Sequence, residues 1–231
     1  MPDDFLIIAH RGASGRWPEN TLLAFRKALD AGAKWLELDV HLSVDSQLVV
    51  IHDETLQRTT NGCGRVDKLS LAELRRLDAG MGESIPLLTE VLALAAGRAA
   101  VNVELKGANT GVALGQLLVE RKETDFLVAE ILASSLYEKE LRSVSMLLPE
   151  LRLAVVAEQF DRQLWQLAEE LDLWSLNLSK QSIDKALIAK AQEQQRRLLA
   201  FTVNEPEEVR RLKSWGLDGV FTDFPERFSA D

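Results

Sequence analysis

The 231-residue sequence predicts an α/β fold, and within that class a TIM-like (β/α)₈ barrel or a doubly wound parallel sheet. Short runs rich in Val, Ile, Leu and Ala alternate with amphipathic segments of about ten residues, which is the pattern of strands and helices in alternation. No Gly/Ser-rich linker or low-complexity stretch divides the chain. We therefore expect a single domain over residues 1–231.

Nine segments have the apolar composition of a strand. They span residues 5–9, 34–40, 47–52, 99–105, 127–132, 152–157, 173–178, 197–203 and 218–222. Only the seven residues VHLSVDS separate the second strand's ELD from QLVVIH, too few for a crossover helix. We therefore expect the second and third strands to form an antiparallel hairpin that returns His52 to about the level of Asp39. The other eight strands then match the number in a (β/α)₈ barrel.

Helix boundaries fall between the predicted strands. They are an Asn20 cap with Gly32 at the other end, a Ser70–Glu73 capping box, Gly97 after the helical segment 87–96, and Asn204 with Pro206 leading to Gly216.

Charge and composition exclude several classes of partner. The net charge of −9 provides no positive field for a nucleic acid, and no segment has the apolar length of a membrane span. The 13 glycines form no nucleotide-binding pattern. The start MPDDFLIIAH lacks the basic and long apolar regions of a signal peptide, and the single Cys63 cannot form an internal disulfide. We expect a cytoplasmic protein, and the sequence leaves its oligomeric state open.

Chargeable residues gather at the ends of the predicted strands, where the active site of a βα barrel lies. They are His10 and Arg11 after the first strand, Glu37 and Asp39 in the second, His52 after the third, and Glu104 and Lys106 around the end of the fourth. Side chains two residues apart on a strand share a face, so Glu37 and Asp39 should point the same way.

Three carboxylates in one semi-buried mouth would repel one another strongly. A divalent cation resolves this repulsion, and all-oxygen ligation by Glu37, Asp39 and Glu104 favours a hard ion, Mg²⁺ or Ca²⁺. Arg11 and Lys106 remain as donors for an anion, and a guanidinium fork suits phosphate oxygens.

Two of the chain's three histidines, His10 and His52, accompany these groups. Imidazoles titrate near neutral pH, so the pair could act as acid and base across a reacting group. The residues predict metal-assisted cleavage of a phosphate ester.

With these motifs, the sequence resembles the glycerophosphodiester phosphodiesterase family over essentially its whole length. The matching motifs are HRG at 10–12, PENT at 18–21, ELDVHLSVD at 37–45, HDETLQRTTNGCG at 52–64, PLL at 86–88, ELK at 104–106, TVN at 202–204 and GVFTDFP at 219–225. Each motif is weak alone, whereas eight in the family's order and spacing are specific.

The resemblance implies a barrel with a small insertion after the third strand, within about 53–85, and hydrolysis of glycerophosphodiesters to sn-glycerol 3-phosphate and an alcohol. It implies His10 and His52 as the acid/base pair, Glu37, Asp39 and Glu104 as metal ligands, and Arg11 and Lys106 as phosphate contacts. Which histidine is the base, which cation is native, whether water or the glycerol 2-hydroxyl attacks and which headgroup is preferred stay open. A lysophospholipase D-type hydrolase and a non-catalytic phosphodiester-binding barrel are the alternatives.

Several neighbouring residues have simpler interpretations. We expect His41 to lie at the rim of the site, and Glu19 and Asn20 to serve the start of a helix. Asp53 could assist His52 or bond the backbone turn. Phe201 departs from the family resemblance, because many members carry Trp before TVN; it keeps an apolar wall.

Overall fold

The computed structural model describes residues 5–120 and 130–228 and forms a closed barrel of eight parallel strands. The strands are β1 (Leu6–His10), β2 (Trp35–Leu42), β4 (Ala100–Leu105), β5 (Ile131–Ser135), β6 (Arg152–Ala157), β7 (Ser175–Ser179), β8 (Arg197–Phe201) and β9 (Gly219–Thr222). Pairing of β1 with both β2 and β9 closes the ring. Because the order β1-β9-β8-β7-β6-β5-β4-β2 returns to β1, the eight parallel strands have no free edge, which confirms the barrel and excludes the open sheet.

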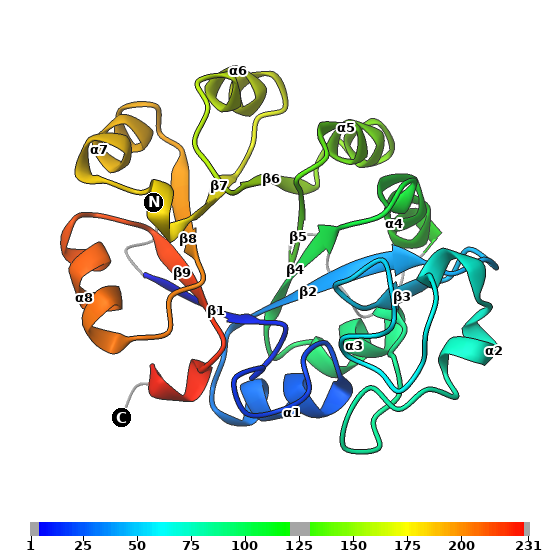
Figure 1. Cartoon of the computed structure of the whole chain (residues 1–231). Helices are drawn as coiled ribbons and strands as arrows, with labels where there is room; N and C mark the ends of the chain where they lie inside the picture. Colours follow the sequence, from blue (N-terminus) through cyan, green and yellow to red (C-terminus); the bar gives the residue numbers. More distant parts are fainter. Residues whose placement is uncertain (1–4, 121–129, 229–231) are drawn as a thin grey trace.

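The helices surround the strands as an outer ring, seen along the barrel in Figure 1. They are α1 (Leu22–Asp30), α2 (Leu71–Leu74), α3 (Leu88–Ala95), α4 (Thr110–Glu120), α5 (Glu138–Leu147), α6 (Gln163–Glu170), α7 (Lys185–Glu193) and α8 (Pro206–Ser214), with short 3₁₀ turns η1 (Val66–Lys68), η3 (Lys180–Ser182) and η4 (Pro225–Arg227). None of the helices in the described residues has the length and apolar character needed to cross a membrane.

The predicted strands agree with those observed to within a few residues. The largest offset is at the fifth, where 127–129 of the predicted 127–132 lie outside the described residues and β5 begins at Ile131. The surplus strand, β3 (Leu48–Val50), is antiparallel to β2, as the short connection predicted, and Val40 faces Val50. The Ile51 N–H donates to the Asp39 carbonyl (3.0 Å), so His52 returns beside Asp39.

Two of the predicted helix caps are wrong. Thr21, not Asn20, caps α1, with its hydroxyl accepting from the Ala24 N–H (3.2 Å). Glu205, not Asn204, occupies the N-cap position of α8. Both asparagines lie just before their helices, but their side-chain amides donate to carboxylates instead, Asn20 to Asp39 in β2 and Asn204 to Asp223 just after β9. The Ser70–Glu73 capping box is present as predicted.

The chain between β3 and α3 forms a small apolar cluster beside the barrel. Val49 and Ile51 contribute to it from the hairpin, and the residues from the intervening segment are Leu56, Val66, Leu74, Ala79 and Ile85. The segment is thereby held against the end of β3, where His52 lies.

Candidate active site

A pocket of about 400 Å³ opens at the carboxyl ends of the strands. It is lined by His10, Arg11, Glu37, His52, Asn102, Glu104, Lys106, Leu136, Val156, Glu158, Asn177, Phe201, Thr202 and Phe221. Six of the seven predicted site residues are among them. The seventh, Asp39, is fully buried beside Glu37 and Glu104.

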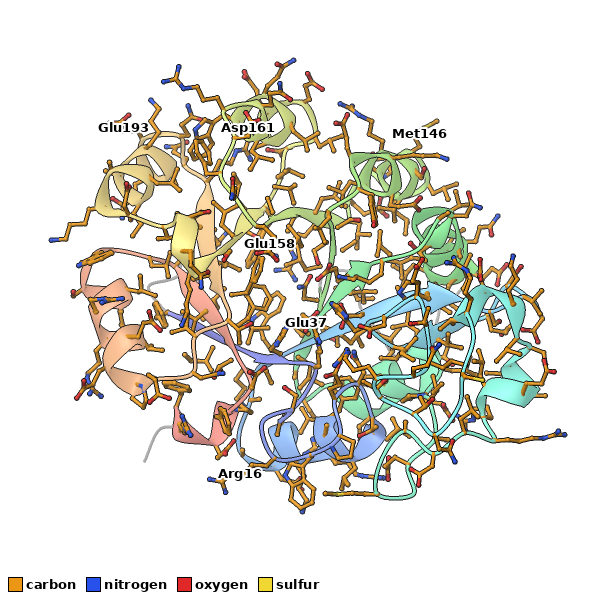
Figure 2. The ribbon with its side chains drawn as sticks, in the orientation of Figure 1. Arg16, Glu37, Met146, Glu158, Asp161 and Glu193 are labelled. Atoms are coloured by element: carbon orange, nitrogen blue, oxygen red, sulfur yellow. The ribbon has the colours of Figure 1, made fainter. Side chains whose placement is uncertain are left out.

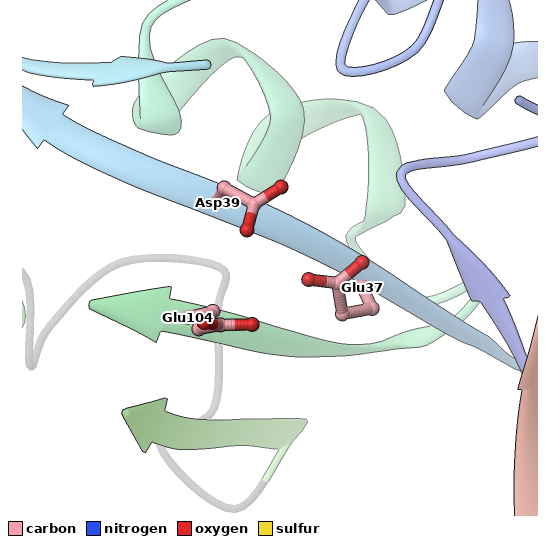
Figure 3. Close-up of side chains that lie close together, drawn as sticks. All are labelled: Glu37, Asp39 and Glu104. Carbon is pink, nitrogen blue, oxygen red and sulfur yellow. The ribbon is translucent and has the colours of Figure 1, made fainter. Parts of the chain in front are cut away.

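The three carboxylates converge from two neighbouring strands. Glu37 and Asp39 come from β2 and Glu104 from β4, as Figure 3 shows, and one oxygen of each lies within 4.8 Å of the others. The register explains the meeting, because Asp39 pairs directly with Glu104 across the two parallel strands. The convergence predicted from side-chain alternation is confirmed.

The hydrogen bonds of these carboxylates leave two oxygens without a donor. Glu37 Oε2 accepts from the backbone N–H of Arg11 (2.9 Å), and Asp39 Oδ2 accepts from the amide of Asn20 (2.9 Å). Within the described part of the chain, the buried Glu37 Oε1 and Asp39 Oδ1 have no hydrogen-bond donor. Burying a carboxylate oxygen is unfavourable unless it binds a cation or accepts a hydrogen bond. The three carboxylates therefore fit a hard metal ion.

Burial and neighbouring charges also shift the pKa values of the three carboxylates. Burial, followed by the charge of Asp39, raises the pKa of Glu37 to about 8. Burial and Asp39 also raise the pKa of Glu104, against the nearby Lys106. Asp39 behaves oppositely: although burial would raise it, the charges of Arg11 and His52 lower its pKa.

Arg11 and Lys106 bring two cations to the carboxylates. Arg11 Nε lies 3.2 Å from Asp39 Oδ2. Lys106 Nζ lies 2.9 Å from Glu104 Oε1 and 3.9 Å from Asp39 Oδ1. The predicted phosphate contacts therefore lie on the pocket surface within reach of one anion.

A tight turn after β1 places His10 and Arg11 at the mouth. Arg11 and Gly12 both have positive φ, 56° and 82°. A Cβ on Gly12 would lie 2.6 Å from the carbonyl carbon of Ala24 in α1, so only glycine permits this contact. The turn after β1 therefore packs directly against α1 at Gly12.

Each pocket histidine is held through Nδ1 by a carboxylate. His10 Nδ1 donates to Asp223 Oδ1 (2.7 Å) and His52 Nδ1 to Asp53 Oδ1 (2.6 Å). The bonds fix the rings and leave Nε2 of both, in the described part of the structure, without a protein partner. The two histidines thus present the same ring nitrogen to one pocket.

The environments of the two histidines differ. Burial would lower the pKa of His10, but the bond to Asp223 and the charge of Glu37 raise it above 6.5 overall. Burial lowers the pKa of His52 below 6.5, although Asp39 acts in the opposite direction. The pKa values of both carboxylate partners are lowered. Burial opposes this for Asp223, yet the bond from His10 lowers its pKa to about 2, and hydrogen bonds from Arg58 lower the pKa of Asp53.

A chain of ion pairs connects His52 to Arg11. Arg58 donates to Asp53 (Nε to Oδ2, 2.7 Å) and to Glu19 (Nη1 to Oε2, 2.7 Å), and Glu19 in turn accepts from Arg11 Nη1 (2.9 Å). Glu19 was expected only to serve a helix start. It instead couples the two ends of the charged site, and Arg58 was not predicted at all.

Three further residues support His10 and were missed. Asp223 also accepts from Asn204 Nδ2 (2.8 Å) and from the Ser14 hydroxyl (3.1 Å). Asp223 follows β9 and Asn204 follows β8, so both occupy the strand-end positions typical of barrel sites. Their position just after a strand was the feature of the sequence that could have identified Asp223 and Asn204 as site residues.

His41 does not lie at the rim. It is 9% exposed, and its Nε2 lies 2.9 Å from the backbone carbonyl of His52. The hairpin explains this: β2 continues past Asp39, so His41 packs beneath the chain that returns from β3.

A barrel whose pocket holds two oriented histidines, a carboxylate cluster and two cations has the groups expected of a phosphodiesterase. The pattern of the glycerophosphoryl diester phosphodiesterase family matches residues 10–227. The chain is 37% identical to a glycerophosphodiester phosphodiesterase of Caldanaerobacter subterraneus subsp. tengcongensis, over 96% of this chain and 95% of that protein. The corresponding enzyme of Bacillus altitudinis is 35% identical, over 96% and 95%.

Solved structures agree. An Oleispira antarctica phosphodiesterase in complex with the product sn-glycerol 3-phosphate superposes with a TM-score of 0.90 at 33% identity, covering 96% of this chain and 94% of that one. This protein belongs to the glycerophosphoryl diester phosphodiesterase family.

Proposed function

We propose that the protein hydrolyses glycerophosphodiesters, such as glycerophosphocholine or glycerophosphoethanolamine, to sn-glycerol 3-phosphate and an alcohol. The observation that carries this proposal is the pair of carboxylate-held histidines facing one pocket with a buried carboxylate cluster. The product bound to the similar Oleispira antarctica phosphodiesterase supports the substrate class.

Arg11 and Lys106 are the proposed phosphate contacts. Each is already oriented by a carboxylate, Arg11 by Glu19 and Lys106 by Glu104. Neighbouring carboxylates raise the pKa of both groups against the effect of burial, so each stays charged. A phosphodiester would accept hydrogen bonds from both without a change in the protonation of either.

His10 and His52 are the proposed acid and base. One ring nitrogen removes the proton from the attacking water or glycerol 2-hydroxyl, and the other gives a proton to the departing alcohol oxygen. Asp223 and Asp53 stabilise whichever ring becomes charged, because each already accepts from its Nδ1. Each transfer contributes roughly 10² to 10⁴ in rate.

Glu37, Asp39 and Glu104 are the proposed ligands of one divalent cation, Mg²⁺ or Ca²⁺. When bound, the ion would supply positive charge to a phosphate oxygen. Arg11 and Lys106 compensate part of the negative charge of the three carboxylates.

The experiment is an assay of glycerol 3-phosphate release from both substrates after treatment with EDTA, with Mg²⁺, Ca²⁺ or no ion added. We expect release of glycerol 3-phosphate to vanish on chelation and to return with one ion. The Glu104→Gln variant should require a higher concentration of that ion for the same release. The thermal midpoint should rise on adding the ion to the wild type and rise less in the variant.

Three outcomes would contradict parts of the proposal. Release that survives thorough chelation would overturn the metal site. Release only from micellar lysophosphatidylcholine would indicate a lysophospholipase D-type hydrolase. Binding of glycerophosphodiesters without turnover would indicate a binding protein.

The attacking oxygen belongs either to water or to the glycerol 2-hydroxyl. Early products of a single turnover distinguish the two routes, because attack by the 2-hydroxyl passes through a cyclic phosphate.

We also propose a cytoplasmic location, supported by the single, exposed and unpaired Cys63, which is compatible with a reducing compartment. Cell fractionation tests this location.

A further inference from the structure

The wall of the pocket opposite the charged cluster is almost uncharged. After Lys106, the chain contributes Leu136, Val156, Glu158, Asn177, Phe201, Thr202 and Phe221 to the pocket. Glu158 is the one charged residue among these described lining residues. A lone carboxylate on an otherwise neutral wall is the feature that the proposed chemistry does not use.

Glu158 is placed at this wall by β6, which ends one residue before it. Its backbone carbonyl accepts from the Ser182 hydroxyl (2.9 Å), which ties its loop to the next one along the barrel. Figure 2 shows Glu158 inside the ring of helices, as Glu37 is, whereas Met146 and Glu193 lie on the outer side. The residue thus faces the mouth from a fixed loop.

Among the described residues, the carboxylate of Glu158 has no cationic partner. In the described part of the chain it forms no ion pair or side-chain hydrogen bond, unlike every other acid that lines the pocket. It also lies outside the carboxylate group of Glu37, Asp39 and Glu104. Its side chain is exposed, so an incoming cation could reach it.

Glu158 also borders a second, more open recess of about 590 Å³. The other residues of that recess are Gln159, Phe160, Ser179, Gln181 and Ser182. Glu158 therefore lies between the reaction pocket and this recess. A substrate arm longer than the phosphate would pass this carboxylate.

We propose that Glu158 selects substrates whose alcohol carries an ammonium group. This inference rests on the proposed hydrolysis and concerns its substrate preference. With the phosphate held at Arg11 and Lys106, one ester arm extends along the neutral wall, where an ammonium two carbons from the ester oxygen would pair with Glu158. Phe201 lines the same wall, and an aromatic ring attracts a cation that lies over its face.

The test compares kcat/KM for glycerophosphoethanolamine with that for glycerophosphoglycerol, whose alcohol arm is uncharged, in the ion-loaded enzyme. We expect the ratio to fall about fivefold in Glu158→Gln and about tenfold or more in Glu158→Lys, mainly through KM of the ammonium substrate. Glycerophosphoglycerol turnover should change less than about twofold in Glu158→Gln. Added salt should reduce the wild-type ratio towards that of this variant.

Glu193→Gln is the matched control. It removes the same charge from the outer end of α7, where Glu193 is exposed and paired with Lys190. Its ratio should equal that of the wild type. An equal fall in both variants would attribute the preference to net charge and overturn the inference.

An unchanged ratio in Glu158→Gln, with both substrates still hydrolysed, would overturn the role of Glu158 and leave the proposed function intact. A wild type that hydrolyses neither substrate would overturn the proposed function, and this inference with it.

Discussion

The two halves of the pocket differ in how their polar groups are held. In the half built from β1 to β4, each charged side chain has a partner, as the bonds of His52 to Asp53 and Lys106 to Glu104 illustrate. On the wall that follows β5 and β6, the carboxylate of Glu158 and the side chain of Leu136, 44% exposed, line the pocket without such partners in the described residues.

This difference separates chemistry from selectivity. Groups that transfer protons or hold a phosphate need fixed geometry, which interlocked ion pairs provide. Groups that only discriminate between alcohols can be single side chains on loops. Substitutions among the interlocked groups, including Asp223 after β9, should therefore change kcat, whereas those at Glu158 and Leu136 should change KM for particular substrates.

The largest effect is expected at the histidines. His10→Ala or His52→Ala should lower kcat by about 10³-fold or more, because each removes a proton-transfer group. Circular dichroism and thermal melting should show a folded protein. The third histidine provides the control: His41→Gln, buried behind His52, should lower kcat by no more than about tenfold. A folded His10 or His52 variant with near wild-type turnover would exclude that residue.

An intermediate effect is expected at Asp223, which acts through its hydrogen bond with His10. Asp223→Asn removes the charge that raises the pKa of His10, so the limb of the pH–rate profile that reports His10 should move to lower pH, with kcat falling about 10²-fold. An unmoved limb would mean that Asp223 does not set this pKa.

The same pair predicts how stability depends on pH. The raised pKa of His10 contributes stability that is complete below 6.5 and is lost as the pH rises through the folded value. The lowered pKa of Asp223 contributes stability that is complete above 3.8 and is lost as the pH falls towards about 2. Denaturant unfolding should therefore show the largest cost of Asp223→Asn between these limits, and a cost independent of pH would contradict the ion pair.

The smallest effect is expected on the neutral wall. Leu136→Ala removes an exposed apolar side chain at the mouth of the pocket. The loss of about 1 kcal/mol of apolar contact with the bound substrate would raise KM about fivefold with kcat unchanged. Met146→Ala, on an 84% exposed side chain away from the pocket, is the control. A fall in kcat in Leu136→Ala would show that this wall also orients the reacting groups.

Local patterns in the sequence determined much of this protein. Strand periodicity placed Glu37 and Asp39 on one face, the seven-residue connection required the β2–β3 hairpin, and the strand-end positions of His10 and Lys106 indicated the pocket. These features depend on neighbours within a few residues, so the sequence alone was sufficient for them.

The tertiary structure decided which groups support the site. His10 and Asp223 are 213 residues apart and meet only because the barrel closes β1 against β9. Asn20 and Asn204 have the sequence pattern of helix caps, but the pairing of each preceding strand with the next one brings Asp39 and Asp223 within reach of their amides, and a hydrogen bond to a carboxylate is stronger than one to a neutral backbone group. Such partners are set by the ring of strands, and no local pattern records them.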